Sequence, residues 1–512
     1  MKSKKKPLEK YKGVNTKNLL IFTILLSLIP LISILQRVFT GDFAFWYDPA
    51  RDLLTALTNL QKPTLIGPTS GIPGVFYGPY WIWLLSIGQL FSKDPRVVMI
   101  IVITIPYLIL FPFILSKFNT VLRPTTIAII WLLFLLHYNY YFTDLWNPYP
   151  APLLMLATIL LLFKSQYALE RKNLLLFFSA GITAGLLVNF HLSLGIGMML
   201  GIILYLLVAM TIRVIHSKTK LQTILYIVYL YGTFALGFVL AFLPYIVFEI
   251  RHQFQQTQAL LNAFMSYGGV VTLQGLSKVE IINNFLERGA TLTHVSIPVF
   301  VIVFLFLTVL YILYVRRCAD RKQDLTLLSI TLSIFLGISF IYLTARNPIW
   351  DYHFTGIEIL FLIIIGILIN KIKWFKAGLG IWIIILLVTS ASQITESIST
   401  DAKKKTGTLS AKQYIVQGII NDVNSDDYAF YSLNPSIYMF DYSYLFKQLG
   451  NKDISYDPGS VPQAKFIYLI IPPESKNVED FMNYRAPKSI YKSEKQSVYP
   501  DGTLVVKFIR VK

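Results

Sequence analysis

The sequence predicts an all-α polytopic membrane protein of about eleven transmembrane helices, followed by a small C-terminal α/β domain. The 512 residues are 55% hydrophobic and only 14% charged, and their mean hydropathy is +0.58. Because soluble domains are about 25% charged, a soluble enzyme is excluded. The high hydrophobicity excludes a disordered chain, and the lone Cys318 excludes a disulfide-rich secreted scaffold.

The predicted transmembrane helices are charge-poor stretches close to the length of about 20 residues that spans a bilayer. They are residues 19–36, 97–116, 124–143, 151–163, 174–190, 193–212, 223–248, 293–315, 325–344, 354–369 and 377–391. A twelfth apolar stretch, residues 77–91, has only 15 residues and contains Pro79 and Gln89.

The positive charges orient these helices. If residues 77–91 do not cross the membrane, the six loops on the N-terminal side hold 22 Lys and Arg, and the opposite loops hold only 8. The positive-inside rule therefore predicts an in-plane helix at 77–91, a cytoplasmic N-terminus and an extracytoplasmic C-terminus in the plasma (inner) membrane. The basic segment 2–17 is interpreted as a topology signal before an uncleaved first helix, and no nucleic-acid partner is expected.

The composition changes after residue 391, which predicts a transmembrane catalytic domain at 1–391 and an extracytoplasmic α/β domain at 392–512. The second segment contains 15 Lys and Arg and 13 Asp and Glu. It has strand-like runs and two helix-like runs, and the second helix-like run ends at Gly450. The predicted strands are 428–433, 464–471 and 503–511, and the predicted helices are 411–423 and 435–449.

Acidic residues outside the C-terminal domain are rare, and most of them fall on the predicted outer face. An outward-facing polar site of this kind is what catalysis or transport at a membrane interface needs. The ten outer residues are Asp42, Asp48, Asp52, Asp94, Asp144, Glu249, Glu280, Glu287, Asp351 and Glu358.

The first outer loop, residues 40–96, is the most informative segment. Asp48 lies at or next to a predicted helix N-terminus, Pro49 occupies a first-turn position, and Asp52 follows one turn later with Arg51 between. A Gly/Pro-rich connector then leads to the in-plane helix, so two juxtamembrane helices are expected to roof a membrane-embedded site. Asp48 is either a helix N-cap with Asp52 as its solvated neighbour, or a base held at the water–lipid boundary.

Four motifs follow one another on the predicted outer face. They are Asp48 with Ala50-Arg51-Asp52, then Pro73-Gly74-Val75-Phe76-Tyr77-Gly78-Pro79-Tyr80, then Asn189-Phe190-His191, and Leu243-Pro244-Tyr245 with Phe248-Glu249-Ile250-Arg251-His252. In this order they resemble the GT-C superfamily of polyprenyl-phosphate-sugar-dependent glycosyltransferases. The resemblance is to the branch of the protein mannosyltransferases and the bacterial aminoarabinose transferases (glycosyltransferase family 39-like), and it covers the membrane part of the chain.

The resemblance implies an enzyme that takes a sugar from a lipid phosphate with inversion at the anomeric carbon. Asp48 would be the general base on the acceptor hydroxyl. The leaving phosphate needs cations more than a general acid. The outer face offers Arg51, His191, Arg251, His252 and Arg346 for this purpose.

The chain also departs from the family pattern. The second outer loop has Asn147 before Pro148 where the family usually has an acidic residue, and Asp144 lies three residues earlier. The late family motif, a basic residue before Tyr and Pro, is replaced by Trp350-Asp351-Tyr352-His353-Phe354. Asp351 is expected to form an ion pair with Arg346 or to contact the donor, and Glu358 to pair or to face the site.

The predicted site therefore has Asp48 as the catalytic residue and a wider set of donor- or substrate-binding residues. That set is Arg51, Asp52, Tyr77, Asp144, His191, Glu249, Arg251, His252, Asp351 and His353. The sequence predicts no certain cofactor; a divalent cation, Mg²⁺ or Mn²⁺, held by Asp48 and Asp144 is an open possibility.

The predicted function is an integral-membrane inverting glycosyltransferase. Its expected partners are a polyprenyl-phosphate-linked sugar, an acceptor protein, lipid or glycan, and membrane lipids. Three alternatives remain open. They are a lipid-linked glycan transporter or flippase, a polyprenyl-diphosphate-dependent glycan polymerase or ligase, and a non-catalytic envelope assembly protein.

Overall fold

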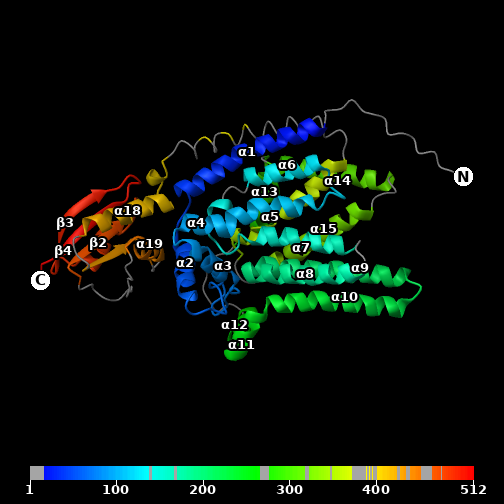
Figure 1. Ribbon diagram of the computed structural model, residues 1–512, viewed down its shortest axis with the longest axis horizontal. Helices are drawn as coiled ribbons and strands as arrows, with labels where there is room; N and C mark the ends of the chain where they lie inside the picture. The colour runs from blue at the N-terminus through cyan, green and yellow to red at the C-terminus, as the bar shows by residue number, and fades with distance from the viewer. Residues whose placement is uncertain are drawn as a thin grey trace.

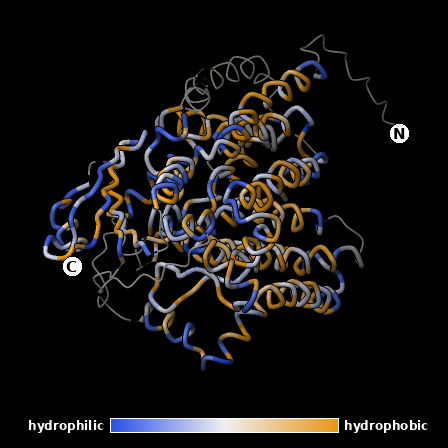
Figure 2. Tube along the Cα trace, turned by 60° about the vertical axis from the view of Figure 1, so that its left-hand side comes forward, coloured by the Kyte–Doolittle hydropathy of each residue, from blue (hydrophilic) through white to orange (hydrophobic). Residues whose placement is uncertain are grey.

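A computed structural model of the chain shows a bundle of long helices with a small sheet domain at one end (Figure 1). The structure describes residues 16–137, 141–166, 170–265, 276–293, 295–317, 322–345, 349–371, 388, 391, 395, 401–423, 427–433, 439–450, 464–473 and 475–511. Hydrophobic residues run along the helices of the bundle, and hydrophilic residues collect at the helix ends and in the sheet domain (Figure 2).

Seven helical segments within the described residues are long and apolar enough to cross a membrane. They are α1 (Thr16–Thr40), the run of α4 (Pro95–Met99), η1 (Ile100–Thr104) and α5 (Ile105–Ser116), α8 (Glu170–Phe190), α9 (Leu192–His216), α10 (Lys220–Ala241), α15 (Lys322–Thr344), and η3 (Asp351–Phe354) with α16 (Glu358–Lys371). The helices α13 (Lys278–Leu292) and α14 (Ile297–Arg317) pass the same test only together, as a pair bent by 80°.

The predicted fold class is confirmed, with corrections to individual helices. The predicted span 223–248 is wrong at its end: α10 stops at Ala241 and α11 (Leu243–Arg251) begins anew, because Pro244 has no amide hydrogen to continue the helix. The predicted spans 124–143 and 151–163 correspond to the shorter apolar helices α6 (Pro124–His137) and α7 (Ala151–Ser165). Of the predicted span 377–391, only residues 388 and 391 are described.

Glycine lets the long helices approach one another closely. On α9, a Cβ atom at Gly201 would lie 2.4 Å from Ile334 Cα of α15, and one at Gly337 of α15 would lie 2.3 Å from the Gly201 amide nitrogen. Close backbone approach at small residues is how helices associate in lipid, where the hydrophobic effect does not drive them together. Large apolar side chains of α1 and α10 are exposed, as expected for lipid-facing positions, whereas α16 is buried along its length.

The C-terminal domain contains a four-stranded sheet of order β1-β2-β4-β3. β1 and β2 pair in parallel, and β4 is antiparallel to both β2 and β3. The strands are β1 (Tyr428–Ser432), β2 (Phe466–Ile471), β3 (Tyr491–Val498) and β4 (Leu504–Arg510), and the helices are η4 (Ala402–Lys404), α18 (Leu409–Asp422), α19 (Phe440–Gly450) and α20 (Val478–Arg485).

The three predicted strands and the two predicted helices of this domain are present, and the analysis missed β3 and α20. β3 is a polar edge strand whose middle residues are exposed, so it lacks the apolar alternation that predicts a strand. The predicted boundary at 391/392 falls in a stretch of which few residues are described, so the division into two domains stays a prediction.

The elements of the first outer loop lie at the end of the bundle that also carries the sheet domain. This loop forms α2 (Tyr47–Asn59) and α3 (Tyr80–Phe91), and α11 and α12 (Gln255–Met265) lie at the same end (Figure 1). With 12 residues, α3 is too short to span a bilayer, in agreement with the predicted in-plane helix. The outward orientation of this end stays a prediction.

The contact between α9 and α15 provides a test of the packing. Gly201→Ala is expected to lower the thermal stability of the detergent-solubilised protein, by ~1–3 kcal/mol, because its methyl group would meet the backbone of α15. Gly232→Ala on α10 is the matched control, since a Cβ atom there meets nothing within 4 Å. Equal melting temperatures for the two variants would contradict the close packing.

Candidate functional site

The centre of the candidate site is the first turn of α2. Asp48 does not cap the helix: the N-cap position is Trp46, and the Asp48 carboxylate pairs with Arg51 one turn later, with Nη1 to Oδ1 at 2.7 Å. The same guanidinium binds Asp52 Oδ1 through Nε at 2.9 Å and Nη2 at 2.8 Å. Arg51 therefore holds two carboxylates, and the N-cap interpretation of Asp48 is wrong.

The two carboxylates differ in exposure. The side chain of Asp52 is 1% exposed and also accepts a hydrogen bond from the Trp81 indole of α3 at 2.9 Å, whereas the side chain of Asp48 is 23% exposed. Burial raises the pKa of Asp52 to about 7 although Arg51 lowers it. Burial also raises the pKa of Asp48, and Arg51 opposes this rise. Asp48 is thus the more accessible acid, and the buried Asp52 anchors the Arg51 guanidinium.

A third carboxylate, Asp144, approaches from the second predicted outer loop. It accepts a hydrogen bond from the Tyr149 hydroxyl at 3.2 Å, and burial raises its pKa to about 7. The negative charge of Asp48 contributes to this rise, so the two carboxylates interact electrostatically. Aromatic rings line the approach: Trp46 packs edge-on against Trp146 with 5.2 Å between ring centroids.

Asn147, which stands where the resemblance leads one to expect an acid, has a structural role. It is buried, and its amide donates to the Phe190 carbonyl at the end of α8 at 2.9 Å. Asn147 also hydrogen-bonds with the Tyr77 side chain, and Asp144 is the acid of this loop whose pKa the charge of Asp48 raises.

The Gly/Pro-rich connector carries Tyr77 into the same region. The connector is held on both sides of Tyr77: the Phe76 amide donates to Gln256 Oε1 of α12 at 2.7 Å, and the Gly78 amide donates to the Asn189 carbonyl of α8 at 3.1 Å. A Cβ atom at Gly78 would lie 1.7 Å from Asn189 Oδ1, so only glycine fits this approach. Burial raises the pKa of the Tyr77 hydroxyl, and the neighbouring Tyr352, Tyr342 and Asp48 raise it further.

His191 and His353 come together from α8–α9 and η3. Their ring centroids are 6.1 Å apart, and His191 Nε2 lies 3.3 Å from the Tyr352 carbonyl oxygen. Burial lowers the pKa of His191 to about 3, so the ring is neutral near pH 7. Burial thus disfavours positive charge on His191, whereas a neutral imidazole can donate or accept a hydrogen bond, and a donor contact by His191 stays a prediction.

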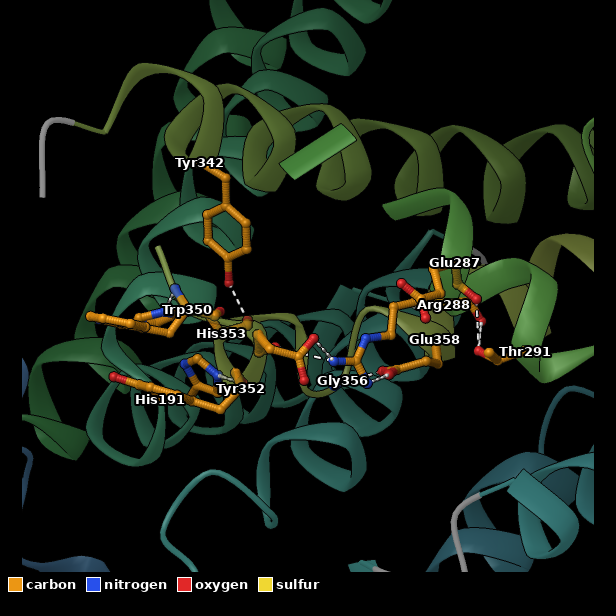
Figure 3. Close-up of polar contacts among 11 residues, drawn as sticks. His191, Glu287, Arg288, Thr291, Tyr342, Trp350, Tyr352, His353, Gly356 and Glu358 are labelled. Carbon is orange, nitrogen blue, oxygen red and sulfur yellow. Dashed lines mark hydrogen bonds and ion pairs between the residues drawn. The ribbon is translucent and has the colours of Figure 1, made fainter. Parts of the chain in front are cut away.

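Arg288 of α13 forms a second group of charges, which the sequence analysis missed (Figure 3). Its Nη2 binds Asp351 Oδ1 at 2.6 Å and its Nη1 binds Glu358 Oε1 at 3.3 Å. The Glu358 side chain is fully buried, and its other oxygen accepts the Gly356 amide at 2.8 Å. The prediction that Glu358 is paired is confirmed. The proposed partner of Asp351, Arg346, lies outside the described residues, and Arg288 binds Asp351 instead.

A local signal could have revealed Arg288. Ser277 and Glu280 form a capping box at the start of α13, and this Ser-x-x-Glu pattern is readable in the sequence. A helix starting there carries Arg288 back toward the bundle. The prediction for residues 249–292 is a loop between two membrane spans and includes no helix at this position.

Glu249, Arg251 and His252 lie at the end of α11. Glu249 is buried and caps α12, because its carboxylate accepts the amides of Gln256 at 3.2 Å and Thr257 at 2.9 Å. Arg251 and His252 are exposed, and the His252 ring stacks on Phe248 with centroids 3.9 Å apart. The structure thus uses Glu249 to support the helix that holds the connector, and a donor contact by Arg251 or His252 stays a prediction.

In the described part of the chain, no group of three or more His, Cys, Asp or Glu side chains is placed to hold a metal ion. The divalent cation at Asp48 and Asp144 stays a prediction.

Comparison with known proteins shows a likeness in fold. No family model matches the chain, and no curated protein sequence matches it. The structure is similar to the solved structure of ArnT from Cupriavidus metallidurans in the apo state, with a TM-score of 0.57 and 11% sequence identity over 95% of this chain and 97% of that chain. This likeness confirms the predicted GT-C-like fold and does not distinguish among its branches.

The ion pairs of Arg288 provide a test of the second charge group. Arg288→Met is expected to destabilise the protein by ~3–5 kcal/mol, because the buried Glu358 loses its cation. Asp351→Asn removes the other partner of the same arginine. Because the Asp351 side chain is 73% exposed, this change is expected to cost about 1 kcal/mol or less. Thermal unfolding of both purified variants checks this order, and a larger loss for Asp351→Asn would contradict it.

Proposed function

We propose that this chain is an integral-membrane inverting glycosyltransferase that moves a monosaccharide from a polyprenyl-phosphate donor to an acceptor hydroxyl. The observation that carries the proposal is the placement of Asp48. This partly exposed carboxylate lies in the first turn of α2, bound to Arg51 and near Asp144, on a GT-C-like fold.

In this proposal Asp48 is the general base. The acceptor hydroxyl transfers its proton to Asp48, its oxygen forms a bond to the anomeric carbon, and the bond from that carbon to the phosphate oxygen breaks. A single in-line displacement inverts the anomeric centre. A base works best when its pKa is raised toward the working pH while it stays ionised. Burial opposed by Arg51 has this effect on Asp48.

Arg51 is the cation proposed to stabilise the leaving phosphate. Its planar fork suits phosphate oxygens, and it is anchored through Asp52 to the Trp81 indole. Because the pKa of Asp52 is raised to about 7, this carboxyl is partly protonated near neutral pH. Arg51 is then less neutralised than it would be beside two fully ionised carboxylates, and its guanidinium can still donate hydrogen bonds to an anionic lipid phosphate.

Asp144 and Tyr77 are proposed to bind the sugars. Both are buried next to Asp48, and both can hydrogen-bond to hydroxyl groups. The aromatic rings of Trp46, Trp146 and Tyr352 beside them offer apolar faces for a sugar ring; Trp146 and Tyr352 have centroids 5.1 Å apart.

Asp48→Asn tests the assignment of the base. In membranes supplied with a labelled polyprenyl-phosphate hexose, the variant is expected to release polyprenyl phosphate at least about 100-fold more slowly than wild type, because the amide cannot accept the proton. Asp480→Asn is the matched control, since Asp480 is an exposed acid of α20 in the C-terminal domain.

Two results would argue against this assignment. Undiminished turnover in Asp48→Asn would remove Asp48 as the base and direct attention to Asp52 or Asp144. Absence of turnover by the wild type with several donors, together with flipping of the lipid, would favour the transporter.

The pH dependence provides a second test. Asp48 accepts a proton only when ionised, so log(kcat/KM) falls as the pH drops through its pKa. Arg51 lowers this pKa, so Arg51→Gln is expected to raise it and to move the acidic limb of the profile to higher pH, besides slowing turnover. Arg213→Gln is the control, because Arg213 lies in the last turn of α9, at the other end of that helix from His191. The acidic limb of its pH profile is expected to stay in place. An acidic limb unmoved by Arg51→Gln would contradict the role of Arg51.

A further inference from the structure

The C-terminal domain is bound directly to the segment that leads into Asp48. Residues 41–46 connect α1 to α2, and three backbone hydrogen bonds join them to residues 407–410, at the start of α18. The Phe45 amide donates to the Gly407 carbonyl at 3.0 Å, the Leu409 amide to the Phe43 carbonyl at 2.9 Å, and the Ser410 amide to the Gly41 carbonyl at 3.1 Å. The C-terminal domain therefore holds the backbone at Phe45, and Asp48 is the third residue after it.

An ion pair reinforces this junction. Lys405 Nζ lies 2.6 Å from Asp42 Oδ2, and the two side chains are 28% and 6% exposed. The pair is therefore largely shielded from water, where an ion pair contributes more than at an open surface. Gly41 has a φ of +72°, and a Cβ atom there would lie 3.3 Å from the Ser410 amide nitrogen, so the two backbones are in close contact.

Aromatic side chains of α19 continue the junction along α2 and α3. Phe440 packs against Tyr47 with 5.0 Å between ring centroids. The Arg51 guanidinium also lies over the Tyr47 ring, 5.5 Å from its centroid. Tyr444 packs against Phe45 at 6.0 Å, and its hydroxyl donates to the Lys93 carbonyl beyond α3 at 2.5 Å. The domain thus contacts the residue before Asp48 and, through Tyr47, the arginine that holds it.

We propose that the C-terminal domain positions the Asp48 carboxylate, and that Lys405 and Asp42 are positioning residues for sugar transfer. The proposal rests on the proposed function. A general base acts only at hydrogen-bond distance from its proton, and a displacement of about 1 Å can cost 100-fold in rate. Loosening the junction therefore lowers kcat and leaves the KM for the donor lipid nearly unchanged.

A charge-swap series in the full-length protein tests the proposal. Lys405→Asp and Asp42→Lys are each expected to lower kcat by about 10-fold or more, and the double variant Asp42→Lys with Lys405→Asp is expected to recover most of this loss. Lys405→Arg is expected to retain turnover where Lys405→Ala loses it. Lys404→Asp, the same charge change at the exposed neighbour, is the matched control.

Amide hydrogen exchange gives a readout that does not depend on turnover. The Phe45, Leu409 and Ser410 amides bridge the junction, so they are expected to exchange faster in the single variants and at the wild-type rate in the double variant. Faster exchange with unchanged kcat would overturn the proposal, because the junction would then be structural alone. Unchanged exchange and unchanged kcat in both single variants would overturn it as well.

The two readouts separate this proposal from the proposed function. If the wild type transfers no sugar from any polyprenyl-phosphate donor, the proposed function fails and the catalytic part of this proposal fails with it. The exchange rates then still decide whether Lys405 and Asp42 hold the segment. If the wild type is active and the swapped pair behaves like the single variants in both readouts, the ion pair is not the positioning contact.

Discussion

The candidate site depends on one guanidinium group that binds two carboxylates of the same helix turn. Arg51 holds Asp48 with one nitrogen and Asp52 with two others, and the Trp81 indole fixes Asp52 from α3. Three charged groups can be kept at a membrane boundary only if each has a partner, since an unpaired charge in a low-dielectric region is costly. This pairing gives Asp48 a fixed orientation and leaves it the most accessible of the three side chains.

The other parts of the site converge on this turn from distant positions in the chain. The connector that carries Tyr77 is held by the Asn189 carbonyl of α8 and by Gln256 of α12, and Glu249 in turn caps α12. On the other side, Arg288 binds η3 and the start of α16 through Asp351 and Glu358. The rings of His191, His353 and Tyr352 lie together beside these contacts, and a Cβ atom at Gly71 of the connector would lie 3.8 Å from the Tyr352 hydroxyl oxygen.

The sheet domain is joined to the helical bundle at the same place. Its contacts are with residues 41–47 and with α2 and α3, the elements that surround Asp48. A domain that only covered this region would not need backbone hydrogen bonds to the segment that leads into α2. The positioning role proposed for this domain follows from that junction.

The sequence by itself determined the membrane class, most of the helices, the short helix at 77–91 and three of the four strands, and it singled out Asp48 as the candidate base. These features follow from local patterns: apolar runs of bilayer length, charge asymmetry, and a Pro in the first turn after an acid. The spacing of Asp48, Arg51 and Asp52 already placed all three within one helical turn.

Only the tertiary structure decided which distant groups meet. It paired Asp351 with Arg288, gave Asn147 and Glu249 structural contacts, and brought Asp144 near Asp48. It also made His191 neutral by burying it, which no spacing in the sequence discloses. The physical reason is that burial and ion pairing depend on neighbours from other elements, whereas helix formation and membrane insertion depend on the residues of one segment.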